Sequence, residues 1–170
     1  ELKKAGGKVF VQQVDVSSMD SIVKAAAATK KQVGNPDVLV NNAGIVRGKW
    51  FWEHDNARDT ALTMNINTLA PMYITHEFLP GMMENKGESR VINICSAAGL
   101  VANPNMSVYC ASKAAATYWS DSLRLELLQA GHDQIKVTTV CPGYINTGMF
   151  DGVKAPLLTP ILTPEIVCDR

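Results

Sequence analysis

The sequence lacks a surplus of charge of either sign and has no long apolar run. Sixteen basic residues balance sixteen acidic ones, so composition gives no indication of a nucleic-acid partner. No segment reaches the roughly 18 consecutive apolar residues that a membrane-spanning helix needs, and the first residues do not resemble a signal peptide. The 46% of apolar residues and 19% of charged residues are typical of a globular protein and exclude disorder.

Cysteine is scarce, with four residues that lie far apart in the sequence, namely Cys95, Cys110, Cys141 and Cys168. Their spacing does not match that of zinc ligands, so we predict no metal site. Three of the four lie in or beside elements that we expect in the core. This position favours reduced, buried thiols in an intracellular protein over disulfide bonds.

Apolar runs alternate with helical patterns along the chain. The runs at 8–14, 37–40, 91–95 and 135–140 predict strands, and the patterns at about 21–33, 56–85 and 107–129 predict helices. A strand, a helix and a further strand at this spacing predict a right-handed parallel crossover. We therefore predict one α/β domain over residues 1–170, a doubly wound, Rossmann-like parallel sheet.

Three side chains with chemical potential converge on the stretch from Ser96 to Lys113. Ser96 follows a predicted strand, and Tyr109 and Lys113 lie four residues apart on one helix face. A free tyrosine has a pKa of about 10, and a nearby cation lowers it. The trio suits interconversion of an alcohol and a carbonyl, with hydride passing to a cofactor. The alternative is a helix with a buried tyrosine and a solvated lysine, but the serine at the strand end favours a site.

Four separated motifs identify a family. They are Asn41-Asn42-Ala43-Gly44, Ser96 with its spacing to the tyrosine, Tyr109-x-x-x-Lys113, and Pro142-Gly143 followed by Thr147. In order and spacing the chain resembles the short-chain dehydrogenase/reductase family over nearly its whole length. The runs 147–150 and 162–165 resemble the branch that contains retinol dehydrogenases and 17β-hydroxysteroid dehydrogenases.

The resemblance implies a role for each motif. Tyr109 would be the general acid/base, Lys113 would lower its pKa and contact the nicotinamide ribose, and Ser96 would orient the substrate oxygen. The cofactor would be NAD or NADP, and its expected contacts are Asp15, Val16, Asn41, Ala43, Gly44, Tyr109, Lys113, Pro142, Gly143, Ile145 and Thr147. Asp15 could instead be a helix cap, and the turns at 41–44 and 142–143 could be ordinary strand-to-loop turns.

Pro71 lies inside the long helical pattern at 56–85. Proline has no N–H, so the carbonyl of Asn67, four residues earlier, loses its helical partner and can bind a water. In the resembled family an asparagine on this helix holds a water of the proton path, which makes Asn67 the fourth catalytic candidate. Asn65 is its competitor, and Asn67 could also merely pack in a kinked helix.

The chain departs from the family in what it lacks. It has no Gly-x-x-x-Gly-x-Gly turn, which in the family cradles the pyrophosphate at a helix N-terminus. We therefore expect an internal piece of a longer enzyme, without the N-terminal strand–helix unit and the C-terminal end of the fold. One side of the sheet would then be exposed, and the residues that choose NAD or NADP would lie outside the chain.

The sequence thus predicts an NAD(P)-dependent oxidoreductase that acts on apolar alcohols and carbonyls such as steroids or retinoids, because the loop at 148–164 is apolar. The resemblance implies a homodimer through the helices at 56–85 and 107–129, and a protein of the cytoplasmic side that a further N-terminal anchor could attach to membranes or lipid droplets. The alternatives are a non-catalytic truncated scaffold and a sugar-nucleotide epimerase or dehydratase, which shares the Tyr-x-x-x-Lys pair.

Overall fold

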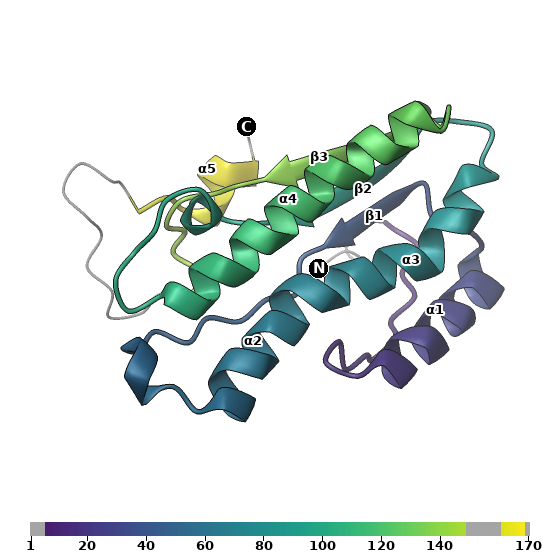
Figure 1. Ribbon diagram of the computed structural model, residues 1–170. Helices are drawn as coiled ribbons and strands as arrows, with labels where there is room; N and C mark the ends of the chain where they lie inside the picture. Colours follow the sequence, from purple (N-terminus) through teal and green to yellow (C-terminus); the bar gives the residue numbers. More distant parts are fainter. Residues whose placement is uncertain (1–5, 149–160, 169–170) are drawn as a thin grey trace.

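A parallel sheet of three strands forms the centre of the computed structural model, which describes residues 6–148 and 161–168 (Figure 1). The strands are β1 (Val38–Asn41), β2 (Ser89–Ile94) and β3 (Ile135–Val140), in that order across the sheet. All three point the same way, and the register sets Asn41 opposite Asn93 and Asn93 opposite Thr139. These are the strands predicted at 37–40, 91–95 and 135–140.

Three long helices lie on the same side of the sheet in Figure 1. They are α1 (Met19–Val33), α3 (Ala70–Met83) and α4 (Ser107–Gln129). Helices α3 and α4 contact the strands, and α1 contacts α3. The shorter turns are η1 (Phe51–Glu53), η2 (Asn56–Ala61), α2 (Leu62–Met64), η3 (Asn65–Leu69), η4 (Ala97–Gly99) and α5 (Pro164–Cys168).

Local sequence signals explain where the long helices begin and end. Ser18 precedes α1, and its hydroxyl oxygen accepts a hydrogen bond from the N–H of Ser21, as an N-cap does. Helix α1 ends before Gly34, which has a φ of 84°. Glycine adopts this positive φ at little steric cost because it has no Cβ. The predicted helices at 21–33 and 107–129 are confirmed, the first with two additional residues at its start.

The helical pattern predicted over 56–85, with an irregularity at Pro71, is confirmed as helical from Asn56 to Met83, but it is not regular α-helix throughout. The segment contains two π-helical stretches, η2 and η3, separated by α2 and followed by α3. At the end of η3 the N–H of Ala70 donates to the carbonyl of Asn65, five residues earlier. Pro71 has no N–H to donate to Asn67, so the regular α-helical hydrogen-bond ladder cannot pass through this point.

The prediction of a strand at 8–14 is also wrong. Among the described residues, no backbone hydrogen bond joins this segment to a strand. An apolar alternating pattern becomes a strand when a neighbouring strand pairs with it, and here no described neighbour does so. Val11 is consequently 78% exposed.

The core lies between the sheet and the helices α3 and α4. Its buried members are Met82, Val91, Leu123, Leu127 and Ile135. The other face of β1 is open, because Val38 and Val40 are 54% and 51% exposed. Helices α3 and α4 therefore cover one face of the sheet, and the opposite face of β1 is exposed among the described residues.

Two further expectations concern particular segments. Within the described ranges, no helix has both the length and the apolar character needed to cross a bilayer. Most of the apolar loop predicted at 148–164 lies outside the described residues, which resume at Ile161.

Candidate active site

A pocket of about 740 Å³ opens at the carboxyl ends of the three strands. This edge is where parallel α/β sheets place their binding sites. The segments that follow β1, β2 and β3 supply most of its wall, and the start of α4 supplies the rest. The lining residues are Asn42, Ala43, Gly44, Ile45, Val46, Arg47, Ile94, Cys95, Ser96, Tyr109, Lys113, Pro142, Gly143, Ile145, Thr147 and Gly148.

Ser96 and Tyr109 meet in this pocket, as the sequence predicted. Ser96 begins the turn η4 after β2, and its Oγ accepts a hydrogen bond of 3.1 Å from the N–H of Ala98. A hydrogen bond from Ser96 lowers the pKa of Tyr109, but burial raises it more, so the pKa lies above its ordinary value. Both residues are buried, at 7% and 4% exposure.

Lys113 also lines the pocket, and its expected effect on the pKa of Tyr109 stays a prediction. Its Nζ donates a hydrogen bond of 2.9 Å to the carbonyl of Ile94 at the end of β2 and lies 6.0 Å from the centre of the Tyr109 ring. Burial lowers the pKa of Lys113 itself.

Asn67 does not line the pocket, but its side chain binds the turn that follows β1. Its Oδ1 accepts a bond of 2.8 Å from the N–H of Ile45, and its Nδ2 donates to the Ile45 carbonyl at 2.9 Å. The same Nδ2 donates to Ser112 Oγ on α4 at 3.0 Å. Side-chain bonds to both backbone groups of Ile45 fix this turn against η3 and α4. The water-binding role of Asn67 stays a prediction.

Gly44 brings its backbone close to two of these groups. A Cβ at this position would lie 3.4 Å from Asn67 Oδ1 and 3.5 Å from Lys113 Nζ. A larger side chain would therefore fill the space between Asn67, Lys113 and the strand end.

Six of the expected cofactor contacts line the same pocket in addition to Tyr109 and Lys113: Ala43, Gly44, Pro142, Gly143, Ile145 and Thr147. Backbone contacts hold Pro142, Ile145 and Thr147 in place, and the N–H of Thr147 donates to the carbonyl of Ile145 at 2.9 Å. The carbonyl of Pro142 accepts from the N–H of Ala97 at 2.9 Å, and Ile145 forms a parallel bridge with Leu162.

The other three expected contacts lie outside this pocket. Val16 and Asn41 line a second hollow of about 200 Å³, which shares Asn42 and Ala43 with the first. The Asn41 side chain donates to Thr75 Oγ1 and to Asn93 Oδ1, so it joins β1 to α3 and β2.

Asp15 lines neither hollow. Its carboxylate accepts from the N–H and the hydroxyl of Ser17, which lowers the pKa of Asp15. These bonds hold the turn before α1, whose N-cap is Ser18 and not Asp15, and the cofactor role of Asp15 stays a prediction.

The sequence-based predictions missed several residues of the site, among them one thiol, one cation and one hydroxyl. Cys95 and Arg47 line the pocket, and Ser112 connects Asn67 to the carbonyl of Tyr109, to which its hydroxyl donates at 2.7 Å. Arg47 follows the Asn-Asn-Ala-Gly turn by three residues, and Ser112 follows Tyr109 by three, one helical turn on. The nearness of Arg47 and Ser112 to the two motifs is the sequence signal that could have identified them as site residues.

The three cysteines whose side chains the structure describes match the expected chemistry but only partly the expected burial. Cys95, Cys110 and Cys141 are free thiols. Cys95 is buried, and burial raises its pKa, whereas Cys110 and Cys141 are half-buried.

Known proteins resemble this chain in sequence and in fold. The family model described as short chain dehydrogenase matches residues 1–157. The chain is 38% identical over 167 residues to epidermal retinol dehydrogenase 2 of Mus musculus, covering 96% of this chain and 53% of the relative. It is 34% identical over 168 residues to estradiol 17-beta-dehydrogenase 11 of Macaca fascicularis, covering 99% of this chain and 55% of the relative.

A solved structure shows the same likeness. A short-chain dehydrogenase/reductase of Burkholderia phymatum in complex with NAD superposes with a TM-score of 0.82 at 29% identity. The match covers 99% of this chain and 61% of that one. The chain spans about half the length of the curated relatives it matches. The matches in sequence and fold show that this chain belongs to the short-chain dehydrogenase/reductase family, in the branch with retinol and estradiol dehydrogenases.

Proposed function

We propose that this chain carries the catalytic centre of an oxidoreductase that interconverts an alcohol and a carbonyl with NAD or NADP. The observation that carries the proposal is that Ser96, Tyr109 and Lys113, far from the other family motifs in sequence, line one pocket with them. The solved relative that binds NAD supports the cofactor class.

Each side chain has a distinct part in the proposed reaction. Ser96 donates a hydrogen bond to the substrate oxygen, and Tyr109 removes or returns the proton on that oxygen. The bound nicotinamide supplies the matching hydride acceptor or donor. Because burial keeps the pKa of Tyr109 above its ordinary value, the phenol is protonated at neutral pH. This protonation state is the one that gives a proton to a carbonyl during reduction.

The residues present fit a nicotinamide nucleotide. Ala43 and Gly44 after β1 and Gly143 after β3 offer backbone without bulky side chains in the pocket, and a Cβ at Gly44 would come into contact with Lys113 Nζ at 3.5 Å. Lys113 would hold the nicotinamide ribose, and Ile145 and Thr147 would hold the carboxamide, as the family resemblance implies. The small residues Ala43, Gly44 and Gly143 let a ligand approach the backbone closely.

The proposed substrates are apolar alcohols or carbonyls. Ile45, Val46, Ile94 and Ile145 contribute an aliphatic lining beside Ser96 and Tyr109. Two relatives are named as a retinol dehydrogenase and an estradiol dehydrogenase, and these names support a retinoid or a steroid.

Turnover and nucleotide binding test the proposal together. The chain, and any longer natural form of it, would be assayed for NADH and NADPH binding by fluorescence and for retinol and estradiol oxidation by nicotinamide absorbance. Tyr109→Phe should reduce kcat by about 10²- to 10⁴-fold, the range for loss of a general acid/base, and should weaken nucleotide binding much less than this, because the aromatic ring is kept. Failure of every form to bind either nucleotide would contradict the proposal and favour a non-catalytic scaffold.

The cellular location implied by the resemblance is the cytoplasmic side, with attachment to membranes or lipid droplets. Cell fractionation of the longest natural form tests it. Recovery of the protein within a sealed organelle lumen would contradict this assignment.

A further inference from the structure

We propose that Arg47 forms an anion-binding subsite in the wall of the pocket and selects substrates that carry a carboxylate on an otherwise apolar body. The inference rests on the proposed function for the identity of the pocket and deepens its substrate class. It starts from the charges that face the pocket. Among the described lining residues, Arg47 and Lys113 are the charged ones.

The two cations differ in how they are used. Lys113 is 5% exposed, and its Nζ donates to the carbonyl of Ile94. The Arg47 side chain keeps 47% of its surface exposed. Arg47 is therefore the cation in this wall that remains accessible to a ligand.

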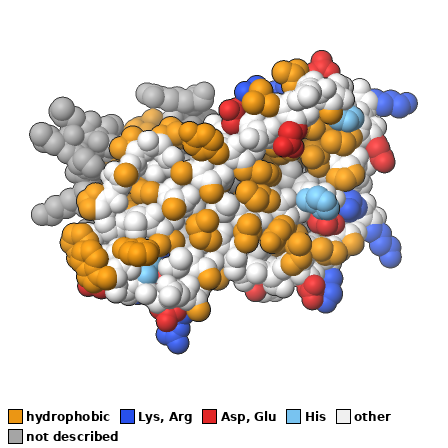
Figure 2. Space-filling view, in the orientation of Figure 1, with side chains coloured by type: hydrophobic (Ala, Val, Ile, Leu, Met, Phe, Trp, Pro, Cys, Tyr) orange, Lys and Arg blue, Asp and Glu red, His pale blue; other side chains and the backbone are white. Residues whose placement is uncertain are grey.

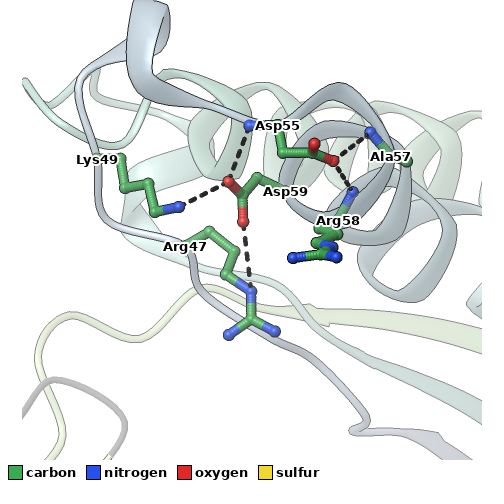
Figure 3. Close-up of polar contacts among 6 residues, drawn as sticks. All are labelled: Arg47, Lys49, Asp55, Ala57, Arg58 and Asp59. Atoms are coloured by element: carbon green, nitrogen blue, oxygen red, sulfur yellow. Dashed lines mark hydrogen bonds and ion pairs between the residues drawn. The ribbon is translucent and has the colours of Figure 1, made fainter.

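Asp59 positions Arg47 without saturating it (Figure 3). The buried carboxylate of Asp59 accepts from Lys49 Nζ at 2.8 Å and from the N–H of Asp55 at 3.0 Å. Its other oxygen lies 3.9 Å from Arg47 Nε, which is beyond hydrogen-bond length. Lys49 thus provides the close ion pair, and Arg47 remains the less neutralised of the two cations.

The terminal nitrogens of Arg47 point away from Asp59 in Figure 3. Within residues 6–148 and 161–168, they have no recorded hydrogen-bond or ion-pair partner. A guanidinium group presents a planar fork of donors that matches a carboxylate in two parallel hydrogen bonds. Because the neighbouring lining is aliphatic, the fitting ligand is an amphiphile with an anionic end.

Two ligands of equal shape test this subsite directly. Decanoate and decanamide differ in charge but little in size, and calorimetry measures the Kd of each without turnover or cofactor. We expect decanoate to bind the chain about tenfold more tightly, the size of one charge-assisted hydrogen bond. Arg47→Gln should abolish this preference and leave decanamide binding unchanged. Equal binding of both ligands, or a preference that survives Arg47→Gln, would overturn the proposal.

A matched variant controls for loss of charge. Arg58 is exposed on η2 and does not line the pocket, so Arg58→Gln should keep the decanoate preference. Loss of the preference in Arg58→Gln would show that net charge, and not the subsite, attracts the ligand, which would also overturn the proposal. Thermal melting confirms that each variant folds.

Two further measurements complete the test. The first distinguishes a site for a substrate carboxylate from a site for the nucleotide phosphates, and the second tests the subsite separately from the proposed oxidoreductase activity. If Arg47→Gln weakens NADH binding and leaves decanoate binding unchanged, Arg47 serves the phosphates of the nucleotide and the substrate subsite is refuted. Tyr109→Phe should keep the decanoate preference while losing turnover. A preference in this chain without turnover in it or in any longer natural form would support the subsite and contradict the oxidoreductase, whereas turnover without the preference would do the reverse.

Discussion

At the scale of single residues, burial decides the charge states of the site. Lys113 keeps its ammonium group among buried atoms, with the Ile94 carbonyl as its recorded hydrogen-bond partner. No ion pair to an acidic side chain is recorded for it in the described part of the chain. A buried ammonium without a carboxylate destabilises the fold, which is why the pKa of Lys113 is lowered. The buried ammonium group of Lys113 therefore lowers the free energy of unfolding, and the site keeps this group for its proposed chemistry.

Replacement of Lys113 should make the protein more stable and inactive. Lys113→Met keeps the length of the side chain and removes the buried charge, so we expect the free energy of unfolding at neutral pH to rise by on the order of 1 kcal/mol. Urea denaturation measures this change. Lys24→Met, on the exposed face of α1, serves as the control and should have little effect.

The gain from Lys113→Met should depend on pH with a definite sign. The pKa of Lys113 is lower in the folded state than in the unfolded state. The stability that the neutral side chain allows is therefore complete only above the unfolded pKa of about 10.5, and it is lost as the pH falls through the folded pKa. The stability difference between variant and parent is thus largest below the folded pKa and shrinks as pH rises toward 10.5. A difference independent of pH over this range would contradict the assignment.

At the scale of elements, buried polar bonds fix the helices and turns to the sheet. Asn93 on β2 accepts from Asn41 Nδ2 at 2.8 Å and donates to Ser120 Oγ on α4 at 2.8 Å, and Ser120 bonds to Thr139 on β3 at 2.7 Å. Asn41, Asn93 and Thr139 also share one row of the sheet register. This row fixes the relative heights of the strand ends, and hence of the loops that form the pocket.

A second set of bonds runs through Ser112 on α4. Ser112→Ala leaves Asn67 Nδ2 without one of its buried partners, so the free energy of unfolding should fall by about 1–3 kcal/mol. Chemical denaturation measures the loss. Ser122→Ala, at an exposed position of the same helix, should change stability by less than about 0.5 kcal/mol. Equal effects of the two substitutions would show that the Ser112 bonds contribute little.

Asp59 fixes the loop at 45–55 that carries Arg47 and an exposed aromatic group. Trp50 and Trp52 stack at 5.2 Å, and Phe51 between them in sequence is 64% exposed. Asp59→Asn weakens the bond to Lys49, so the loop should open more often and chymotrypsin should cleave it several-fold faster. Mass spectrometry of the first products measures cleavage at these aromatics. Asp121→Asn, which removes an exposed pair with Arg124, should leave the cleavage rate unchanged.

At the scale of the whole molecule, apolar side chains lie on the outer surface of the helical layer. Figure 2 shows hydrophobic side chains spread over the face that α3 and α4 present. On α4, Tyr118, Leu125 and Leu128 are 78%, 50% and 59% exposed. Tyr118 and Leu125 lie seven residues apart, on the same side of the helix. Such a surface supports the predicted homodimer through these helices.

A charge on this surface should prevent association. Tyr118→Glu places a carboxylate where the partner helix would pack, so we expect a monomer, while Tyr118→Phe should remain a dimer. Size-exclusion chromatography with light scattering gives the mass of each. A parent chain that is monomeric at all concentrations would refute the homodimer for this chain, and a dimeric Tyr118→Glu would place the interface elsewhere.

The sequence by itself determined the strands β1, β2 and β3, the helices α1 and α4, and the meeting of Ser96, Tyr109 and Lys113. These features follow from short-range rules: apolar periodicity, a capping serine at 18, and a four-residue spacing on one helix face. Parallel strands then bring the ends of β2 and β3 to the same edge as the start of α4, whatever the details of the loops.

The tertiary structure alone decided the features that depend on a neighbour distant in sequence. Residues 8–14 have an apolar pattern but no described pairing strand, so they are not a strand. Lys113 turns to the Ile94 carbonyl because the end of β2 lies within its reach. Arg47 is placed by Asp59 through an ion pair that only the folded loop creates. A periodic pattern reports on the residues beside it, whereas hydrogen bonds and ion pairs between segments depend on how the whole chain is folded.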